Sequence, residues 1–560
     1  MKKLFVRILG CIMICTMLVS ALSSCEIDED LLNSILEEYL GGLDIDDELG
    51  KLDGPMSDVN YPPNDSDGFH EGIVETHGPD DYTDPSVDTD PIYDAETGGN
   101  GDNFVDVPDD NDFEGIVVGI NTRGVKGREQ YRREFDSEVP SDPLDVKIMK
   151  RNSEVEKELN VKIKIMTDMF DGVGDQGIID FVKAEYQAGN QSGTDVLSVY
   201  AAYANAAALR GYYVNLVDNS KLPYLNEKSS YWNQSYVKAA TCKGQLYTIV
   251  GDLNLSIYDR SFVTLFNAGL AKEYAKIDVD AFYDEVLKGD WTYKKLYTMV
   301  TEFPYQDNGT SNVVDPADKI PYASVSGSEE ADGYLRAWDI QMVKEEVTGN
   351  HSLTIDGNTR LETGIANMQQ LRNAQGVYID SIENTFNKTF LAGNALFDVD
   401  ILYRNATSND QLRNCGFDYA ILPLCKYEDK QTEYYTTPQD AYNAMSIFKH
   451  RPERLEAVSA TLDLMCKKTH DDVRPYYIEK MVKATYVSGA DQIKMLELVM
   501  NGTSFTTEVI YSSHLNYVSI RMWRTPIMKG NDMLTSWAAI KPGTEEAVRD
   551  FDAYFEAIKE

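Results

Sequence analysis

Two carboxylates that lie close together in the sequence are the leading candidates for chemistry on a ligand. Asp398 and Asp400 stand two residues apart in an apolar run, so in a strand both side chains point to one face. Paired carboxylates hydrolyse glycosides when one protonates the leaving oxygen and the other assists from the opposite side. Carboxylates also accept hydrogen bonds from sugar hydroxyls, with Arg404 nearby as a donor. We favour binding over hydrolysis, because no metal cluster, nucleophile elbow or catalytic triad accompanies the pair in the sequence. A solvated loop in which the carboxylates contact no ligand is the third alternative.

Aromatic side chains form the second group of interest. The chain has 35 Tyr and 5 Trp against 19 Phe. A ring with a polar edge can cover the apolar C–H face of a sugar while its edge stays hydrated, although tyrosine is also common on secreted surfaces. Core packing is the alternative role for each ring. The other candidates for ligand contact, chosen by position at expected strand ends, at an expected hinge or in polar surroundings, are Arg123, Tyr200, Tyr203, Trp232, Asp252 and Trp338.

A parallel α/β sheet is expected to position the first of these residues. Short apolar or alternating runs at 115–120, 161–165 and 195–200 predict strands, and helical spacing separates or follows them at 144–159, 178–187 and 203–210. This alternation predicts parallel strands. Ligands of such sheets bind beyond the carboxyl ends of the strands, which is where Arg123 and Tyr200 fall.

We expect no cofactor and no metal. Residues 172–177 read GVGDQG, a literal match to a dinucleotide-binding pattern. Five residues separate that match from the preceding strand, and Asp175 inside it would repel a pyrophosphate. We therefore interpret the segment as a loop near the strand ends that could touch a ligand.

The N-terminus has the pattern of an export signal. Lys2, Lys3 and Arg7 precede an apolar stretch at 8–22, which is too short to span a bilayer. It ends in Leu22-Ser23-Ser24-Cys25, which resembles the bacterial lipobox. We predict a lipoprotein signal peptide at 1–24 and a lipid on Cys25 that anchors the protein to the extracytoplasmic face of the cell membrane. An ordinary signal peptide with an incidental cysteine is the alternative.

The charge of the chain is concentrated in one segment. There are 92 Asp+Glu and 52 Lys+Arg, for a net charge of -40, and residues 26–114 hold 29 of the acidic groups with Lys51 as their single basic residue. Such a charge repels phosphate backbones, so nucleic acid is excluded as a partner. High charge, few aliphatic residues and many prolines predict that 25–112 is a lipidated N-terminus followed by a disordered acidic linker.

From residue 244 onward, the order of five motifs resembles family 1 extracellular solute-binding proteins, the sugar receptors of ABC importers. The motifs are GQLYTIVGD at 244–252, LFN at 265–267, GDWTY at 289–293, GNALF at 393–397 and FDYAILPL at 417–424. Ala268 and the pair Leu424-Cys425 depart from the family pattern. The resemblance covers about 113–560.

The resemblance implies a two-lobed α/β fold like that of the periplasmic binding proteins (type II), with sugar in the cleft between lobes. Lobe 1 would be 113–255 with a return segment at about 440–495, and lobe 2 would be 256–439 with about 496–560. A hinge is expected near 249–258 and a second crossing near 437–442. It further implies a monomeric, non-enzymatic lipoprotein that delivers a carbohydrate, expected to be an oligosaccharide, to ABC transporter permease subunits. A secreted lipoprotein enzyme acting on glycans and a surface binding protein without a transporter are the alternatives.

Overall fold

The computed structural model describes a discontinuous set of residues, all within the compact unit Gly68–Glu560. They are 112–123, 133–136, 143–167, 175–218, 220–309, 314–325, 329–380, 388–402, 412, 415–479 and 489–558. The expected signal peptide, the lipidated Cys25, the acidic linker and Arg404 lie outside these residues. Among the described helices, none is long and apolar enough to cross a membrane.

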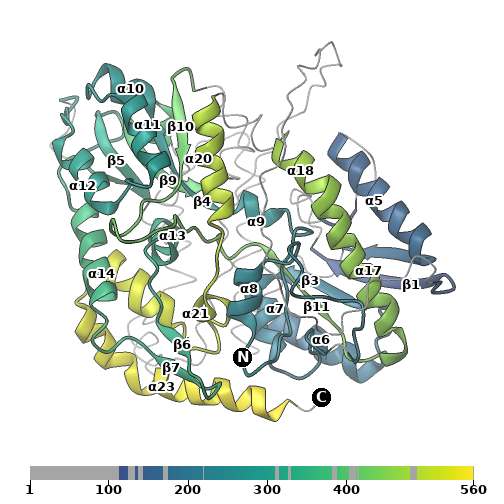
Figure 1. Ribbon diagram of the computed structural model, residues 1–560. Coiled ribbons are helices and arrows are strands. Elements are labelled where there is room, and N and C mark those ends of the chain that lie inside the picture. The colour runs from purple at the N-terminus through teal and green to yellow at the C-terminus, as the bar shows by residue number, and fades with distance from the viewer. Residues whose placement is uncertain are drawn as a thin grey trace, which may run out of the picture. The chain divides into compact units, whose positions relative to one another are not determined.

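The first sheet has the strand order β11-β3-β1-β2. Its central strand β1 (Ile116–Thr122) runs parallel to β2 (Val161–Met166) and to β3 (Val196–Tyr200), and β11 (Asn443–Ile447) is antiparallel to β3. Four consecutive buried residues of β3 explain why its sequence is apolar without alternation. Figure 1 shows the helices around this sheet, α5 (Pro143–Leu159), α6 (Asp175–Ala188), α7 (Ala201–Ala208) and α17 (Leu455–Lys468).

The second sheet has the order β10-β4-β9-β5-β8. Here β4 (Phe262–Asn267) is antiparallel to β9 (Ala395–Ile401) and to β10 (Tyr419–Leu422), whereas β5 (Ile320–Val325) is parallel to β9 and β8 (Tyr378–Asp380). We call each sheet with its helices a lobe. Two separate mixed sheets, each flanked by helices, confirm the predicted two-lobed α/β class.

The remaining elements are mostly short. They are α8 (Gln234–Ala240), α9 (Ser256–Asp259), α10 (Ala268–Glu273), α11 (Val279–Lys288), α12 (Tyr293–Glu302), α13 (Glu329–Ala337), β6 (Val343–Glu345), β7 (His351–Leu353), α14 (Thr359–Arg372), α15 (Lys388–Leu391), η2 (Pro452–Arg454), η3 (Thr469–Val473), α18 (Arg474–Tyr476), α20 (Ala490–Asn501), α21 (Thr507–Ile510), η5 (Ile520–Arg524), α22 (Thr525–Lys529) and α23 (Met533–Ala557).

Three crossing segments lie side by side between the lobes. We call 251–261 the first crossing, 436–442 the second and 502–506 the third. The first and second are joined where Phe262 N donates to Thr437 O at 3.3 Å and Gln439 N to Arg260 O at 2.8 Å. The second and third are joined by Ser504 N, which donates to Thr436 O at 2.9 Å. The family resemblance predicted the first two crossings near 249–258 and 437–442, and its lobe boundaries implied a further crossing near 496; the third crossing carries no motif of its own.

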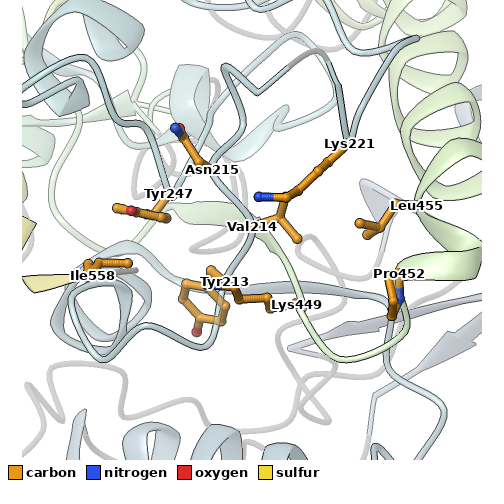
Figure 2. A pocket seen from close by; sticks show the side chains of 9 residues that line it. All are labelled: Tyr213, Val214, Asn215, Lys221, Tyr247, Lys449, Pro452, Leu455 and Ile558. Carbon is orange, nitrogen blue, oxygen red and sulfur yellow. The ribbon is translucent and has the colours of Figure 1, made fainter. Parts of the chain in front are cut away.

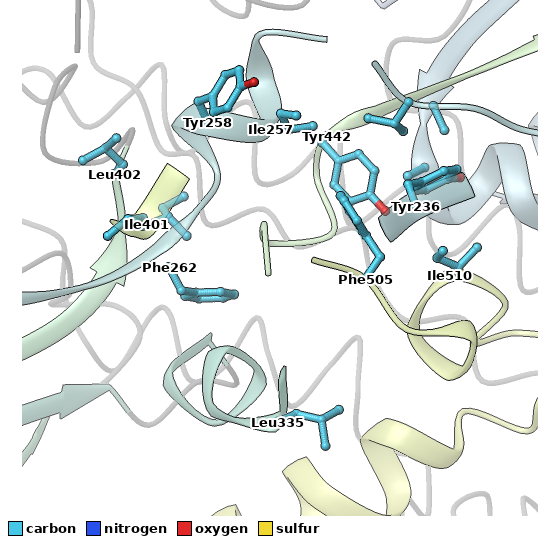
Figure 3. Close-up of a cluster of buried hydrophobic side chains, with 14 of the residues drawn as sticks. Tyr236, Ile257, Tyr258, Phe262, Leu335, Ile401, Leu402, Tyr442, Phe505 and Ile510 are labelled. Carbon is cyan, nitrogen blue, oxygen red and sulfur yellow. The ribbon is translucent and has the colours of Figure 1, made fainter. Parts of the chain in front are cut away.

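A buried apolar cluster surrounds the crossings, as Figure 3 shows. Tyr258 comes from the first crossing, Tyr442 from the second and Phe505 from the third. The rings of Tyr442 and Phe505 are 5.4 Å apart at 62°, and Phe505 also meets Tyr236 of α8 at 5.1 Å. Edge-to-face contacts of this kind add to the area buried, so the crossings are packed rather than merely threaded between the lobes.

The C-terminal helix α23 contacts more than one part of the structure. Asp552 on α23 accepts a hydrogen bond from the backbone of His351 on β7 and pairs with its imidazole at 2.6 Å. One turn later the ring of Phe555 stacks on Tyr247, 6.1 Å away. Tyr247 precedes the first crossing, so the end of α23 contacts residues that the sequence placed in lobe 1.

Candidate functional site

The carboxyl ends of β1 and β3 bring three sequence-predicted residues together. Tyr200 is the last residue of β3, and α7 begins immediately after it, which places Tyr203 within the first helical turn. The two rings lie 4.6 Å apart with an interplanar angle of 33°, and both side chains are half-buried. Arg123 follows β1, and its guanidinium carbon is 5.1 Å from the centre of the Tyr200 ring. We call these three residues the aromatic platform.

The polar ends of the platform are held by the second crossing and the start of β11. Arg123 donates from Nε to Asn443 Oδ1 at 2.9 Å and from Nη2 to the carbonyl of Ala441 at 2.8 Å. Burial raises the pKa of the Tyr200 hydroxyl well above its ordinary value, and the neighbouring Asp440, to which it is hydrogen-bonded, raises it further. The hydrogen bonds of Arg123 and Tyr200 therefore hold the platform in orientation, and the Tyr200 hydroxyl is neutral at physiological pH.

A buried carboxyl lies behind the platform. Glu134 Oε1 accepts hydrogen bonds from the backbone N–H of Ser256 at 2.9 Å and from its hydroxyl at 2.5 Å. Its Oε2 accepts from Asn443 Nδ2 at 3.0 Å. Burial raises the pKa of Glu134 to about 7, against the opposing effect of these donors and of Arg123. The same Asn443 thus contacts both the platform and this carboxyl.

The structure places Asp252 in an internal polar cluster rather than on open surface. Its Oδ2 lies 2.5 Å from His470 Nδ1, and its Oδ1 lies 3.2 Å from Arg474 Nε. Its hydrogen bond with His470 raises the pKa of that imidazole. His470 belongs to η3, a π-helical turn, and such turns occur often at functional sites. Asp252 therefore fastens the first crossing to the segment after α17, a role that differs from the predicted ligand contact.

Two predicted ligand contacts, Trp232 and Trp338, are core residues in this conformation. Both are 0% exposed. The indole of Trp232 donates to Asp463 Oδ1 at 3.2 Å, and that of Trp338 donates to the carbonyl of Cys425 at 3.1 Å. Neither ring offers a face to a ligand. The polar residues next to Trp232 in the sequence predicted a solvated site. In the structure its hydrogen-bond partner is Asp463, a buried residue that is distant in the sequence.

The carboxylate pair is also buried. Asp398 and Asp400 share a face of β9, as predicted, but they are only 3% and 5% exposed, because all seven residues of β9 are buried and α10, α13 and α15 contact the strand. Asp400 accepts a hydrogen bond from the backbone of Ile401 at 2.7 Å. An oxygen without access to solvent cannot receive a sugar in this conformation, so neither the hydrolytic nor the binding role is supported here. Arg404, their expected companion, lies outside the described residues.

Sequence reasoning missed three residues of the site, namely Glu134, Asp440 and Asn443. The family resemblance placed the second crossing next to Asp440 and Asn443, which was the available signal. Nothing in the sequence around Glu134 indicates burial.

A separate small cavity of about 180 Å³ lies away from the platform on lobe 1, beside the end of the chain (Figure 2). Its lining residues are Tyr213, Val214, Asn215, Lys221, Tyr247, Lys449, Pro452, Leu455 and Ile558. Among the described residues, no group of three or more His, Cys, Asp or Glu side chains could hold a metal ion.

Comparisons with known proteins gave structural neighbours only. No family model and no curated protein matches the chain. Solved structures that align with it include the uncharacterized protein lmo0859 from Listeria monocytogenes, at 12% identity and TM-score 0.49, covering 77% of this chain and 100% of that one. Others are an extracellular solute-binding protein from Staphylococcus aureus in complex with maltose (11%, TM-score 0.47, 80% and 100%) and a maltose/maltodextrin-binding domain from Bdellovibrio bacteriovorus bound to maltotriose (13%, TM-score 0.45, 78% and 100%). The Staphylococcus aureus protein carries the class name, extracellular solute-binding protein, whose motifs the sequence resembles. The fold class of this chain rests on its sheet topology.

Proposed function

We propose that the chain is a carbohydrate receptor that binds its ligand at the aromatic platform, between the two lobes. On this proposal Cys25 carries the lipid anchor on the extracytoplasmic face of the membrane. An oligosaccharide is the ligand, and the receptor delivers it to the permease subunits of an ABC importer. The protein acts as a monomer and carries out no reaction.

The observation that carries this proposal is the tilted stack of Tyr200 and Tyr203 beside Arg123, at the carboxyl ends of two parallel strands. Half-buried rings supply an apolar face for the C–H surface of a sugar. The exposed Asp440 next to Tyr200 supplies an acceptor for a hydroxyl. The lobe-crossing segments border the same site, so a ligand there can alter how the lobes meet.

The test is a panel of maltotriose, cellotriose, xylotriose and mannotriose, measured by calorimetry on the purified chain. We expect at least one sugar to bind. Tyr203→Ala should weaken that binding by about 1 kcal/mol or more through loss of ring contact, which is about five-fold or more in Kd. The matched control is Tyr186→Ala. Tyr186 also contacts another tyrosine, Tyr212 at 4.9 Å, but it lies on α6 outside the platform.

Equal effects of the two variants would remove the platform from the proposal, and a chain that binds none of the sugars while folded would remove the carbohydrate. The competing function, an enzyme acting on glycans, requires product to appear on incubation with the same panel. It also requires that product to vanish in Asp398→Asn or Asp400→Asn. The burial of both carboxylates argues against that outcome.

A further inference from the structure

Glu134 joins the platform to the first crossing through two hydrogen-bonded neighbours. On one side Asn443 connects it to Arg123. Asn443 Nδ2 donates to Glu134 Oε2 at 3.0 Å, and Asn443 Oδ1 accepts from Arg123 Nε at 2.9 Å. On the other side both hydrogen bonds of Oε1 come from Ser256, the first residue of α9 in the first crossing. Glu134 is 0% exposed, so its carboxyl has no water to replace these partners. A shift of the first crossing would remove Ser256 and admit water to the carboxyl.

Two charged side chains, Arg123 and Arg151, lie next to Glu134. Arg123 faces it from the end of β1. Arg151 of α5 donates to the backbone carbonyl of Glu134 at 2.9 Å, and Asp136 and Cys466 act on Arg151 in turn. No other ionisable residue contacts the carboxyl among the interactions resolved for the described residues.

Two further titratable groups hold the same crossing at its two ends. Asp259, at the end of α9, accepts a hydrogen bond from the Tyr477 hydroxyl and is near Arg260 and Arg133. Asp252, at the beginning of the crossing, pairs with His470 and Arg474, and Asp471 is near His470. The first crossing is thus attached to the first lobe at three points, each of which includes a group that can gain or lose a proton.

We propose that Glu134 is a positioning residue that couples the platform to the first crossing, so that proton binding at its carboxyl holds the crossing, and with it the lobes, in the arrangement described. The inference rests on the proposed function only in its consequence for ligand affinity. The coupling of protons to lobe arrangement does not require a ligand.

The direction of the effect follows from the burial of the group. Burial raises the pKa of Glu134 to about 7, from 4.5 in water. An arrangement that hydrates the carboxyl returns its pKa toward 4.5, so the described arrangement binds protons more tightly. Acid therefore favours the described arrangement, and this advantage is lost progressively as pH rises from about 4.5 to about 7. Asp259, whose pKa burial raises to about 6, and His470, whose pKa is raised by Asp252, shift in the same direction.

The experiment measures lobe separation in the ligand-free full chain between pH 5.5 and 8. Donor and acceptor dyes are attached at residue 157 of α5 and residue 272 of α10, where a ketone-bearing amino acid replaces two exposed lysines and leaves the native cysteines unlabelled. We expect energy transfer to change as pH rises toward 7 and to level off above 7. Glu134→Gln, which keeps the shape but cannot ionise, should lose the largest part of this change and retain only the part that Asp259 and His470 contribute.

Asp463→Asn is the matched control. Asp463 is also buried, and burial raises its pKa to about 6, but its partners Tyr231, Trp232 and Asn226 all belong to the first lobe. This variant should keep the wild-type pH response. A wild-type signal that is flat with pH would overturn the coupling. So would a response that survives in Glu134→Gln and disappears in His470→Gln, since the proton would then act elsewhere.

The consequence for binding is measured separately, by calorimetry with whichever sugar of the panel binds. Kd should depend on pH below about pH 7 in the wild type and level off above it, by at most about tenfold per pH unit for one proton. In Glu134→Gln this dependence should be weaker. If energy transfer responds to pH while no sugar binds, the carbohydrate proposal fails and the coupling stands. If a sugar binds with a pH-independent lobe separation, the coupling fails alone.

Discussion

Arg123 and Asn443 are hydrogen-bonded at 2.9 Å although 320 residues separate them in the sequence. Arg123 follows β1, and Asn443 begins β11, which enters the same sheet from the other end of the chain. Asn443 is 0% exposed, and its amide serves both Arg123 and Glu134. One side chain therefore determines the position of two charged groups at the site.

Asn443→Ala should reduce both stability and affinity. The substitution removes the buried hydrogen bonds that Asn443 makes with Arg123 Nε and Glu134 Oε2, which destabilises the fold by about 1–3 kcal/mol. Urea unfolding measures the first effect and calorimetry with a sugar measures the second. Asn190→Ala is the control, because Asn190 is buried and hydrogen-bonded to Thr194 within its own loop. It should lose stability without losing affinity; a similar loss of affinity in both would contradict the role of Asn443.

Trp338→Ala should cost stability and leave the ligand contact surface intact. The ring is buried between Tyr293, 5.3 Å away, and Trp523, 5.9 Å away, in the core of lobe 2. Truncating a buried tryptophan to alanine typically lowers the free energy of unfolding by about 3–5 kcal/mol. Urea unfolding of the variant measures this. If the variant kept its stability but no longer bound sugar, Trp338 would be a ligand contact after all.

The pH dependence of stability should include a contribution from Asp463. Burial raises its pKa from 3.8 to about 6, so the folded state holds this proton more tightly than the unfolded state. The stabilisation is complete below about pH 4 and is lost as pH rises through about 6, with a limit of about 3 kcal/mol. Urea unfolding of wild type and Asp463→Asn between pH 4 and 8 isolates it, since the variant should lack this component. Parallel curves for the two proteins would refute the assignment.

Cys25→Ala should release the protein from membranes, because we expect the lipid on its thiol to be the hydrophobic attachment. Fractionation of cells that express the variant should recover it in the soluble extract. Cys415→Ala serves as a control that removes a half-exposed thiol from the folded region and should stay with the membrane. Continued sedimentation of the Cys25 variant with membranes would mean that another attachment exists.

Local pattern was sufficient for much of the first lobe. The runs at 115–120, 161–165 and 195–200 correspond to β1, β2 and β3. These three strands pair with one another and lie within about 85 residues of each other in the sequence, so local patterns were enough to predict them. The rule that ligands sit beyond strand ends identified Arg123 and Tyr200 before their contact was known.

The roles of other side chains could not be predicted, because distant partners decide them. The indole of Trp232 donates a hydrogen bond to Asp463, which is 231 residues away in the sequence. Asp252 is hydrogen-bonded to His470, which is 218 residues away. Sequence spacing gives no information about pairs at such separations. The two aspartates of β9 illustrate a related difficulty: their shared face was predicted correctly, but both faces of the strand are buried, and α10, α13 and α15, which contact it, come from other parts of the chain.

The strand order of the first sheet has a consequence for synthesis. β3 is complete at residue 200, yet its antiparallel neighbour β11 ends at residue 447. Until the ribosome has released that later strand, β3 has a free edge with apolar residues and unpaired backbone groups, a template for wrong pairing. The nascent N-terminal half therefore cannot complete its native sheet during most of translation. A polypeptide that stops before Asn443 should therefore keep the outer edge of β3 open, although β1, β2 and β3 can already pair with one another.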